Sequence, residues 1–382
     1  EVALDFLYFK TRGVSSSVLQ KQASRFYPSG NSFGPSGVKS LKVNLQSEGW
    51  ILPWTLSLRM LVTSKSGTGN DQTLRLPIHG IFRILVVNTG GFQAERLDDY
   101  AKLYSIIREV LAPSYTQDEL HIGSGKTGDT LGATESKYFQ MPIMCGLTQT
   151  SEKAWPLSKC PIVFDFSLVD SSSEWLQGTN SSFEISQVCV EGDVVQLDPS
   201  IDEALAKKLL QGGSLNVPIT SYFVSSSMVD QANTSIATSR ALSRLKKVFI
   251  NFAGTTDAKG VLRYPGDAFR VGVRVGGSCY PQHDIDNNVD AHYHLKKCLG
   301  HDLDGRMALN ISPAEWKSTK YTLGMRFDKD ESFGSGLSLT QGELFTTMMT
   351  GIDTSAVSEC FVIFEHDVII SIMDQGAAQV FD

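Results

Sequence analysis

The chain has 382 residues, of which 41% are hydrophobic, and carries a formal net charge of −7. That length fits two domains of ordinary size, each with enough apolar residues to bury a core. The acidic balance and the lack of a basic tail argue against a surface that grips nucleic acid by neutralising phosphates, so we expect no direct, sequence-specific nucleic-acid binding.

No apolar run reaches the roughly 18 residues of a membrane-spanning helix, and the N-terminal stretch lacks the basic-then-apolar order of a signal peptide. We therefore expect a protein of the cytosol or nucleus without a transmembrane segment. The six cysteines are widely spaced and form no CxxC pair, which predicts free buried thiols rather than a disulfide framework or a zinc ribbon.

The first half is predicted to consist mainly of strands. Residues 1–37 combine aromatic residues with a Ser/Gly/Pro-rich tract, which predicts an arm lying along a neighbour or along its own sheet. One helix is expected, over residues 97–111, where apolar residues recur on one face. Alternating or continuous apolar residues predict strands over residues 38–45, 55–62, 78–87, 138–144, 162–168 and 183–197.

A helical connector is expected between the halves, over residues 198–212. Asp198-Pro199-Ser200 is a helix start, and Gly212-Gly213 ends the segment. Apolar residues at near-helical spacing, among them Leu205, predict a buried face that docks this helix between two separately cored barrels.

The second half repeats the strand-rich style with one short helix over residues 289–299. Its predicted strands cover residues 215–224, 245–252, 269–275, 321–328, 337–347, 360–364 and 368–373. About eight strands per half, with loops long enough to cross between sheets, predict an all-β double jelly roll. We thus expect two eight-stranded β-sandwich barrels, with short helices in loops, over residues 38–197 and 213–382.

Three patterns are candidates for ligand sites. For each of them, a purely structural role of the same residues is the better-supported interpretation. Residues 123–128 contain the Gly-Lys-Thr that closes the phosphate-binding loop pattern, but Leu120 stands where that pattern needs glycine. His294, Cys298 and His301 have the spacing of metal ligands on a helix face, with His283 and His292 nearby, although Gly300 should end that helix first.

The third pattern is a set of paired acidic residues that could hold calcium but lack the spacing of a calcium loop. These pairs are Asp284 with Asp286 and Asp302 with Asp304. No GxSxG, HExxH or CxxC motif is present either. We therefore predict no catalytic residue, no metal and no cofactor.

Several separated stretches resemble double jelly-roll major capsid proteins of polinton-like viruses, adintoviruses and their relatives in the adenovirus-hexon lineage. Residues 194–198, followed by the acidic helix, look like the family's connector between barrels. Residues 239–250, 269–281 and 291–300 are similar to its second-barrel strands, Tyr-Pro turn and aromatic helix, and residues 367–382 to its last strand and tail. The likeness is stronger in the second half.

The resemblance implies a structural protein of the virion and not an enzyme. It implies a homotrimer that forms a pseudo-hexameric capsomer and tiles an icosahedral DNA-virus shell, assembled in the host cytoplasm or nucleus. The partners it implies are neighbouring capsomers, penton proteins and minor capsid proteins.

The alternative is a carbohydrate-binding or carbohydrate-cleaving β-sandwich protein, in which tryptophans line a sugar groove and two carboxylates act as acid and base. The candidate tryptophans for that groove are Trp50, Trp54, Trp155, Trp175 and Trp316.

Overall fold

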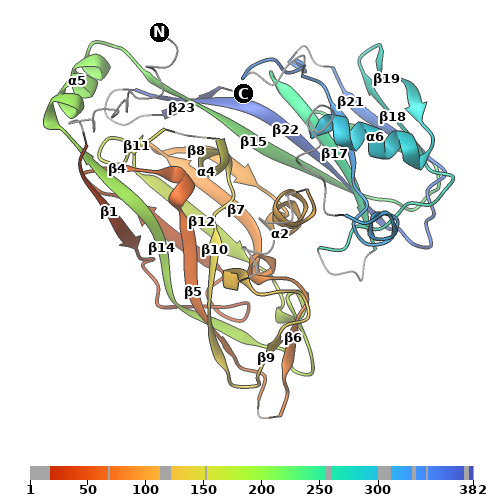
Figure 1. Cartoon of the computed structure of the whole chain (residues 1–382), viewed down its shortest axis with the longest axis horizontal. Coiled ribbons are helices and arrows are strands. Elements are labelled where there is room, and N and C mark those ends of the chain that lie inside the picture. The colour runs from red at the N-terminus through yellow and green to blue at the C-terminus, as the bar shows by residue number, and fades with distance from the viewer. Residues whose placement is uncertain are drawn as a thin grey trace, which may run out of the picture.

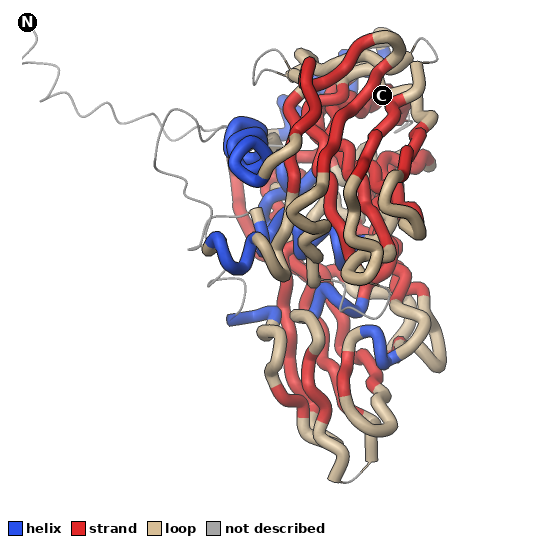
Figure 2. Tube along the Cα trace, turned by 90° about the vertical axis from the view of Figure 1, so that its right-hand side faces the viewer, coloured by secondary structure: helices blue, strands red, loops and turns tan. Residues whose placement is uncertain are grey.

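The protein is built from two β-sandwich barrels placed side by side, seen from the front in the computed structural model of Figure 1. Figure 2 shows in side view that strands form the body of the molecule, with the helical segments mainly on one side. The residues that the structure describes are 18–67, 69–111, 122–150, 153–254, 260–299, 311–328, 333–340, 343–373 and 378–381.

In the first barrel, two sheets of four long strands face each other. One sheet has the order β1 (Val18–Phe26), β14 (Phe183–Leu197), β5 (Ser57–Ser64), β10 (Ser136–Pro142). The other has the order β3 (Ser40–Leu45), β12 (Ile162–Leu168), β7 (Phe82–Thr89), β8 (Phe92–Leu97). Strict alternation of buried and more exposed residues along β3, β5 and β12 fills the space between the sheets.

The second barrel repeats this order strand for strand. Its first sheet runs β15 (Leu215–Met228), β22 (Glu359–Ile372), β17 (Leu245–Ala253), β20 (Leu323–Arg326). Its second sheet runs β16 (Thr234–Thr238), β21 (Phe345–Thr350), β18 (Arg270–Val275), β19 (Ser278–Ile285). The predicted all-β double jelly roll is therefore confirmed, and the duplication lies in topology rather than in sequence.

Shorter elements decorate the barrels. The additional strands are β2 (Ser32–Phe33), β4 (Trp50–Ile51), β6 (Gln72–Leu74), β9 (Thr130–Leu131), β11 (Trp155–Pro156), β13 (Leu176–Gln177) and β23 (Ala378–Phe381). The helical segments are η1 (Pro53–Thr55), η2 (Ile78–Ile81), α2 (Tyr100–Tyr104), η3 (Ser105–Val110), α4 (Gly146–Thr150), η4 (Ser172–Glu174), α5 (Pro199–Leu210), α6 (Asn288–Cys298) and α7 (Pro313–Trp316). The predicted single helix of the first half is thus joined by α4, which sequence periodicity did not indicate.

The predicted arm is partly a strand of its own barrel. Within residues 1–37, β1 pairs with β14, and the ion pairs Lys21–Asp193 (2.8 Å) and Arg25–Glu191 (2.7 Å) link the two strands. Most of β1 is exposed, and Phe26 is its one buried side chain. Residues 1–17 lie outside the described part of the chain.

The connector helix forms where its caps predict it. Asp198 accepts a hydrogen bond from the Ser200 amide (2.9 Å), Pro199 occupies the first turn, and Gly212 follows with a φ of +79°. Its position differs from the prediction. Figure 1 shows α5 at the end of the first barrel that points away from the second, so it does not dock the barrels.

One hydrophobic core spans the first barrel and the junction, which corrects the expectation of two separate cores. It includes residues on the outer face of the second barrel's β15 and β22, such as Ile219, Ile363 and Ile370. A second cluster fills the interior of the second barrel and takes the alternate residues of β22, Val362 and Phe364. The barrels are therefore held together by a buried sheet face.

Four of the predicted strands were wrong in detail. Residues 360–364 and 368–373 form one continuous strand, β22, because the polar residues between them are buried and paired within the sheet. Residues 78–81 form η2 rather than the start of a strand. Of residues 337–347, only the last three belong to a long strand, β21.

The buried side of α5 is carried by Leu209, which is 3% exposed, whereas Leu205 is only half-buried. We expect Leu209→Asp to lower the free energy of unfolding by about 3 kcal/mol, because it places an unpaired charge in an apolar contact. Leu205→Asp should cost less. Leu210→Asp, at a side chain 73% exposed, is the matched control and should change stability by less than about 0.5 kcal/mol in urea titrations. Equal effects at Leu209 and Leu210 would contradict a buried face.

Candidate assembly surfaces

Two of the three candidate metal ligands, His294 and Cys298, lie on α6. Cys298 is fully buried, and its Sγ donates to the Met325 carbonyl (3.5 Å) between α6 and β20. Burial raises the pKa of this thiol well above its ordinary value, which disfavours the thiolate that would bind a metal. His301, Asp302 and Asp304 lie outside the described residues. Among the residues described, no three His, Cys, Asp or Glu side chains gather in a way that could hold a metal ion.

The glycine-rich segment at residues 123–128 begins in a helical turn that ends at residue 124 and finishes in a turn at residues 127–128. The Lys126 amide donates to the Asp129 carboxylate (2.8 Å), so a carboxylate already occupies the position that a phosphate would need. The chain continues into β9 instead of a helix whose N-terminus could face an anion. This geometry is that of a surface turn.

A buried Ser–His–Glu group, absent from the sequence predictions, lies near the junction. His79 Nε2 is 2.8 Å from Ser105 Oγ, and the Glu109 carboxylate is 3.9 Å from the same nitrogen. A catalytic triad needs the carboxylate on the other ring nitrogen, and His79 and Ser105 are at most 1% exposed. Burial raises the pKa of Glu109 to about 7. The group therefore has the geometry of a structural polar network.

The tryptophans do not form a sugar-binding platform. Four of the five are at most 9% exposed, and only Trp54 is substantially exposed. The buried indoles donate to protein acceptors, for example Trp155 to the Cys160 carbonyl (2.7 Å) and Trp50 to Asp202 (2.8 Å). These side chains stabilise the barrels, which removes the feature on which the carbohydrate alternative depended.

Polar contacts across the junction help to hold the two barrels together. The Glu95 carboxylate of β8 accepts hydrogen bonds from Ser221 Oγ (2.6 Å) and from the Gly146 amide (2.8 Å). The Lys102 ammonium of α2 lies 3.2 Å from the centroid of the Phe361 ring on β22. Burial raises the pKa of Glu95 to about 7, although its hydrogen bonds oppose that shift. Sequence reasoning missed this junction because single polar residues in apolar strands carry no motif.

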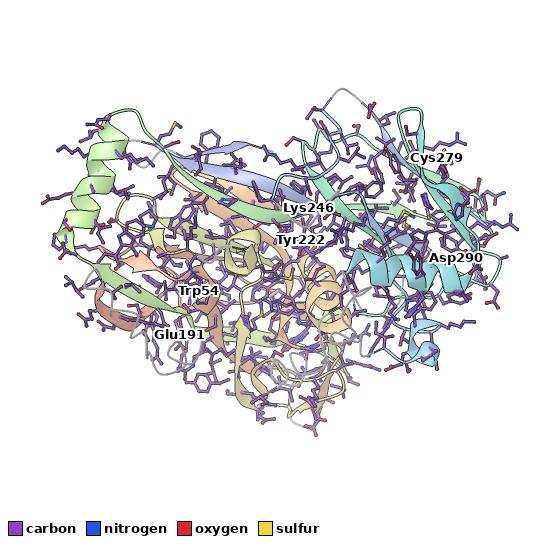
Figure 3. All side chains as sticks on the ribbon, turned by 45° about the horizontal axis from the view of Figure 1, so that its top comes forward. Trp54, Glu191, Tyr222, Lys246, Cys279 and Asp290 are labelled. Atoms are coloured by element: carbon purple, nitrogen blue, oxygen red, sulfur yellow. The ribbon has the colours of Figure 1, made fainter. Side chains whose placement is uncertain are left out.

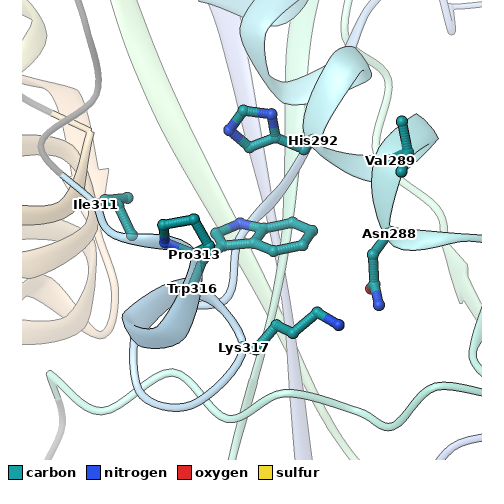
Figure 4. Close-up of a pocket in the computed structure, with 7 residues that line it drawn as sticks. All are labelled: Asn288, Val289, His292, Ile311, Pro313, Trp316 and Lys317. Atoms are coloured by element: carbon teal, nitrogen blue, oxygen red, sulfur yellow. The ribbon is translucent and has the colours of Figure 1, made fainter.

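Two exposed surfaces stand out because each combines aromatic and polar groups. On the first barrel, the outer face of β5, β10 and β14 presents Tyr138, which is 50% exposed, with the Arg59 guanidinium 4.9 Å from its ring centroid. On the second barrel, α6 and α7 border a groove of about 350 Å³. Figure 4 shows the Trp316 indole in this groove, with His292 and Val289 of α6 facing it.

Comparisons with known proteins indicate a fold but no close relative. No family model matches the chain, and no curated protein matches it. A chain of the PBCV-1 virus capsid aligns with a TM-score of 0.70 at 12% identity, covering 98% of this chain and 99% of that one.

Two further solved structures align over similar lengths. A chain of the Sputnik virophage gives 0.66 at 10% identity, covering 100% and 92%. The Faustovirus major capsid protein gives 0.62 at 8% identity, covering 92% and 90%. At these identities the likeness establishes architecture, and it agrees with the strand order described above: the chain has the double jelly-roll fold found in these viral capsid structures.

Proposed function

We propose that this chain is the major capsid protein of a DNA virus. Three copies would form a pseudo-hexameric capsomer, and such capsomers would tile an icosahedral shell. The observation that carries the proposal is the repeated strand order, which puts two similar barrels side by side in one chain. Three chains then supply six barrels around one axis, and head-to-tail contacts can close that ring.

The comparisons support the proposal without identifying the virus. Both named capsid structures and the virophage chain share the full-length arrangement of two barrels. We infer from the sequence resemblance that the virus belongs with the polinton-like viruses and adintoviruses. On this proposal the protein acts in the virion as a structural component, after assembly in the host cytoplasm or nucleus, and catalyses no reaction.

The proposed partners follow from the same role. They are two further copies of the chain, neighbouring capsomers, and penton and minor capsid proteins. We infer that residues 1–37 tie capsomers together, with β1 as the part paired within its own barrel. Residues 198–212 would then connect a first barrel that includes β1 and residues 38–197 to a second barrel over residues 213–382. None of the described helices is long and apolar enough to cross a membrane.

The purified protein should be a stable homotrimer, with a mass three times that of the 41.8 kDa chain. An obligate interface of this kind buries more than about 2,000 Å², so the trimer should persist at micromolar concentration. Light scattering measures the mass, and electron microscopy should show uniform triangular or hexagonal particles. A well-behaved monomer at that concentration would be incompatible with the capsomer.

A further inference from the structure

The repeated strand order gives every segment of the first barrel a counterpart in the second. The segment between β8 and β10 carries α2 and η3, and the segment between β19 and β20 carries α6 and α7. In the same way, the sheet β1–β14–β5–β10 corresponds to β15–β22–β17–β20. A contact that a segment of one barrel makes within the chain can therefore be compared with the surface of its counterpart in the other barrel.

Within the chain, α2 and η3 are buried against the second barrel. Lys102 of α2 lies over Phe361 on the outer face of β22, and both side chains are at most 6% exposed. A Cβ on Gly260 of the second barrel would lie 3.5 Å from Ser105 Oγ of η3. Figure 1 shows α2 between the two barrels. This contact joins a helical segment of one barrel to the outer sheet face of the next.

The counterparts of both halves of this contact are exposed. On α6, Val289 is 79% and Tyr293 is 57% exposed, beside the groove above Trp316. The outer face of the first barrel's sheet presents Tyr138 of β10 and the partly exposed Glu191 of β14. On the second barrel, Phe361 of β22 is buried under Lys102 of α2, whereas β20 is covered by α6 of the same barrel. In Figure 3, Tyr222 lies near the junction, whereas Glu191 lies on the first barrel and Asp290, of α6, on the second.

We propose that the α6–α7 groove of one copy docks on the outer face of β14, β5 and β10 of a second copy. The contact repeats, between chains, the one that α2 and η3 make within the chain. Because it joins two different surfaces, it is head to tail, and three such contacts close a ring of six barrels. This inference rests on the proposed trimer and names the two surfaces that build it.

The chemistry of the two surfaces suits such a contact. Aromatic residues and arginine are enriched at protein interfaces, and both occur here, with Tyr293 and His292 on the helix and Tyr138 with Arg59 on the sheet. The groove can receive a side chain from the facing sheet, because it is open and lined by Val289 and Trp316. The exposed apolar side chains of α6 would then be buried between copies, as residues of α2 are buried within the chain.

Two variants test the assignment. A groove variant combines Val289→Asp with Tyr293→Asp, and a face variant combines Tyr138→Asp with Gln140→Asp. All four side chains are exposed, so folding should be preserved, which the melting temperature of each variant checks. Light scattering should show each variant alone at one third of the wild-type mass. Phe92→Asp, at a similarly exposed aromatic residue at the start of β8, is the control and should remain a trimer.

Mixing the two variants tests directly whether the groove of one copy binds the sheet face of another. The groove variant keeps an intact sheet face and the face variant an intact groove, so an equimolar mixture should form heterodimers of twice the chain mass. Folded variants that remain trimeric would overturn this assignment while leaving the proposed capsomer intact. A wild-type protein that is itself monomeric would overturn both.

Discussion

Asp367→Ala should lower the free energy of unfolding by about 3–5 kcal/mol, the range for breaking a buried ion pair by removing one partner. Asp367 is 0% exposed on β22 and lies 3.3 Å from the Lys246 ammonium, which is 12% exposed. The carboxylate also accepts hydrogen bonds from Thr220 Oγ1 (2.9 Å) and from the Gly334 amide (2.8 Å). Alanine would leave a buried cation and two donors without an acceptor.

The measurement is urea unfolding of the purified protein, with soluble yield as a second readout should the alanine variant fail to fold. Asp367→Asn keeps one acceptor oxygen and should lose less stability than the alanine variant. Asp170 provides the matched control, because it pairs with Arg83 and Lys39 on the surface, where all three side chains are 44–58% exposed. Asp170→Ala should cost at most about 1 kcal/mol. Equal losses at the two aspartates would contradict the importance of burial.

Sequence patterns predicted those parts of the fold that depend on local chemistry. The strand over residues 162–168 alternates strictly and agrees with β12 residue for residue. The connector begins and ends where Asp198 and Gly212 place its caps. These predictions are correct because strand alternation and helix capping depend on residues that are close together in the sequence.

The junction could not be predicted in the same way. Both faces of β22 are buried, one inside the second barrel and one against the first, so its sequence has no polar side that shows which neighbour it meets. The polar run Glu365–Asp367 then looked like a break between two strands. The carboxylates of Glu365 and Asp367 pair with Lys247 and Lys246, which are distant in sequence, and a local pattern cannot show such pairs.

The same limit applies to the candidate sites. The helix predicted over residues 289–299 agrees with α6, on which His294 and Cys298 lie. Their spacing could not tell that Cys298 points into the core. The groove above Trp316 lies between α6 and α7, and no sequence pattern indicates that these two helices lie side by side. Surfaces formed by topology, rather than by sequence motifs, become visible only when the barrels are compared.

Glu95→Gln should make the protein more stable at neutral and alkaline pH. The folded structure raises the pKa of Glu95 from its ordinary value of 4.5 to about 7, chiefly through burial. The folded state therefore holds this proton more tightly than the unfolded state. The resulting stabilisation is fully present below about pH 4.5 and is lost as the pH rises through about 7, and it amounts to roughly 3 kcal/mol for this shift.

Glutamine can keep the local hydrogen bonds, because its oxygen can accept from the Gly146 amide and its amide can donate to Ser221 Oγ. The difference in free energy of unfolding between the variant and the wild type should therefore grow by up to about 3 kcal/mol from pH 4.5 to 8, measured by urea titration at each pH.

Glu109, whose pKa is also raised to about 7, should contribute a similar but separate slope. Glu109→Gln should remove that contribution, and the changes in pH dependence caused by Glu95→Gln and Glu109→Gln should add in the double variant. The two carboxyls lie on the first barrel at its junction with the second, so their ionisation should loosen that junction in particular. A difference between Glu95→Gln and the wild type that stays constant across this pH range would contradict a buried, proton-retaining carboxyl at the junction.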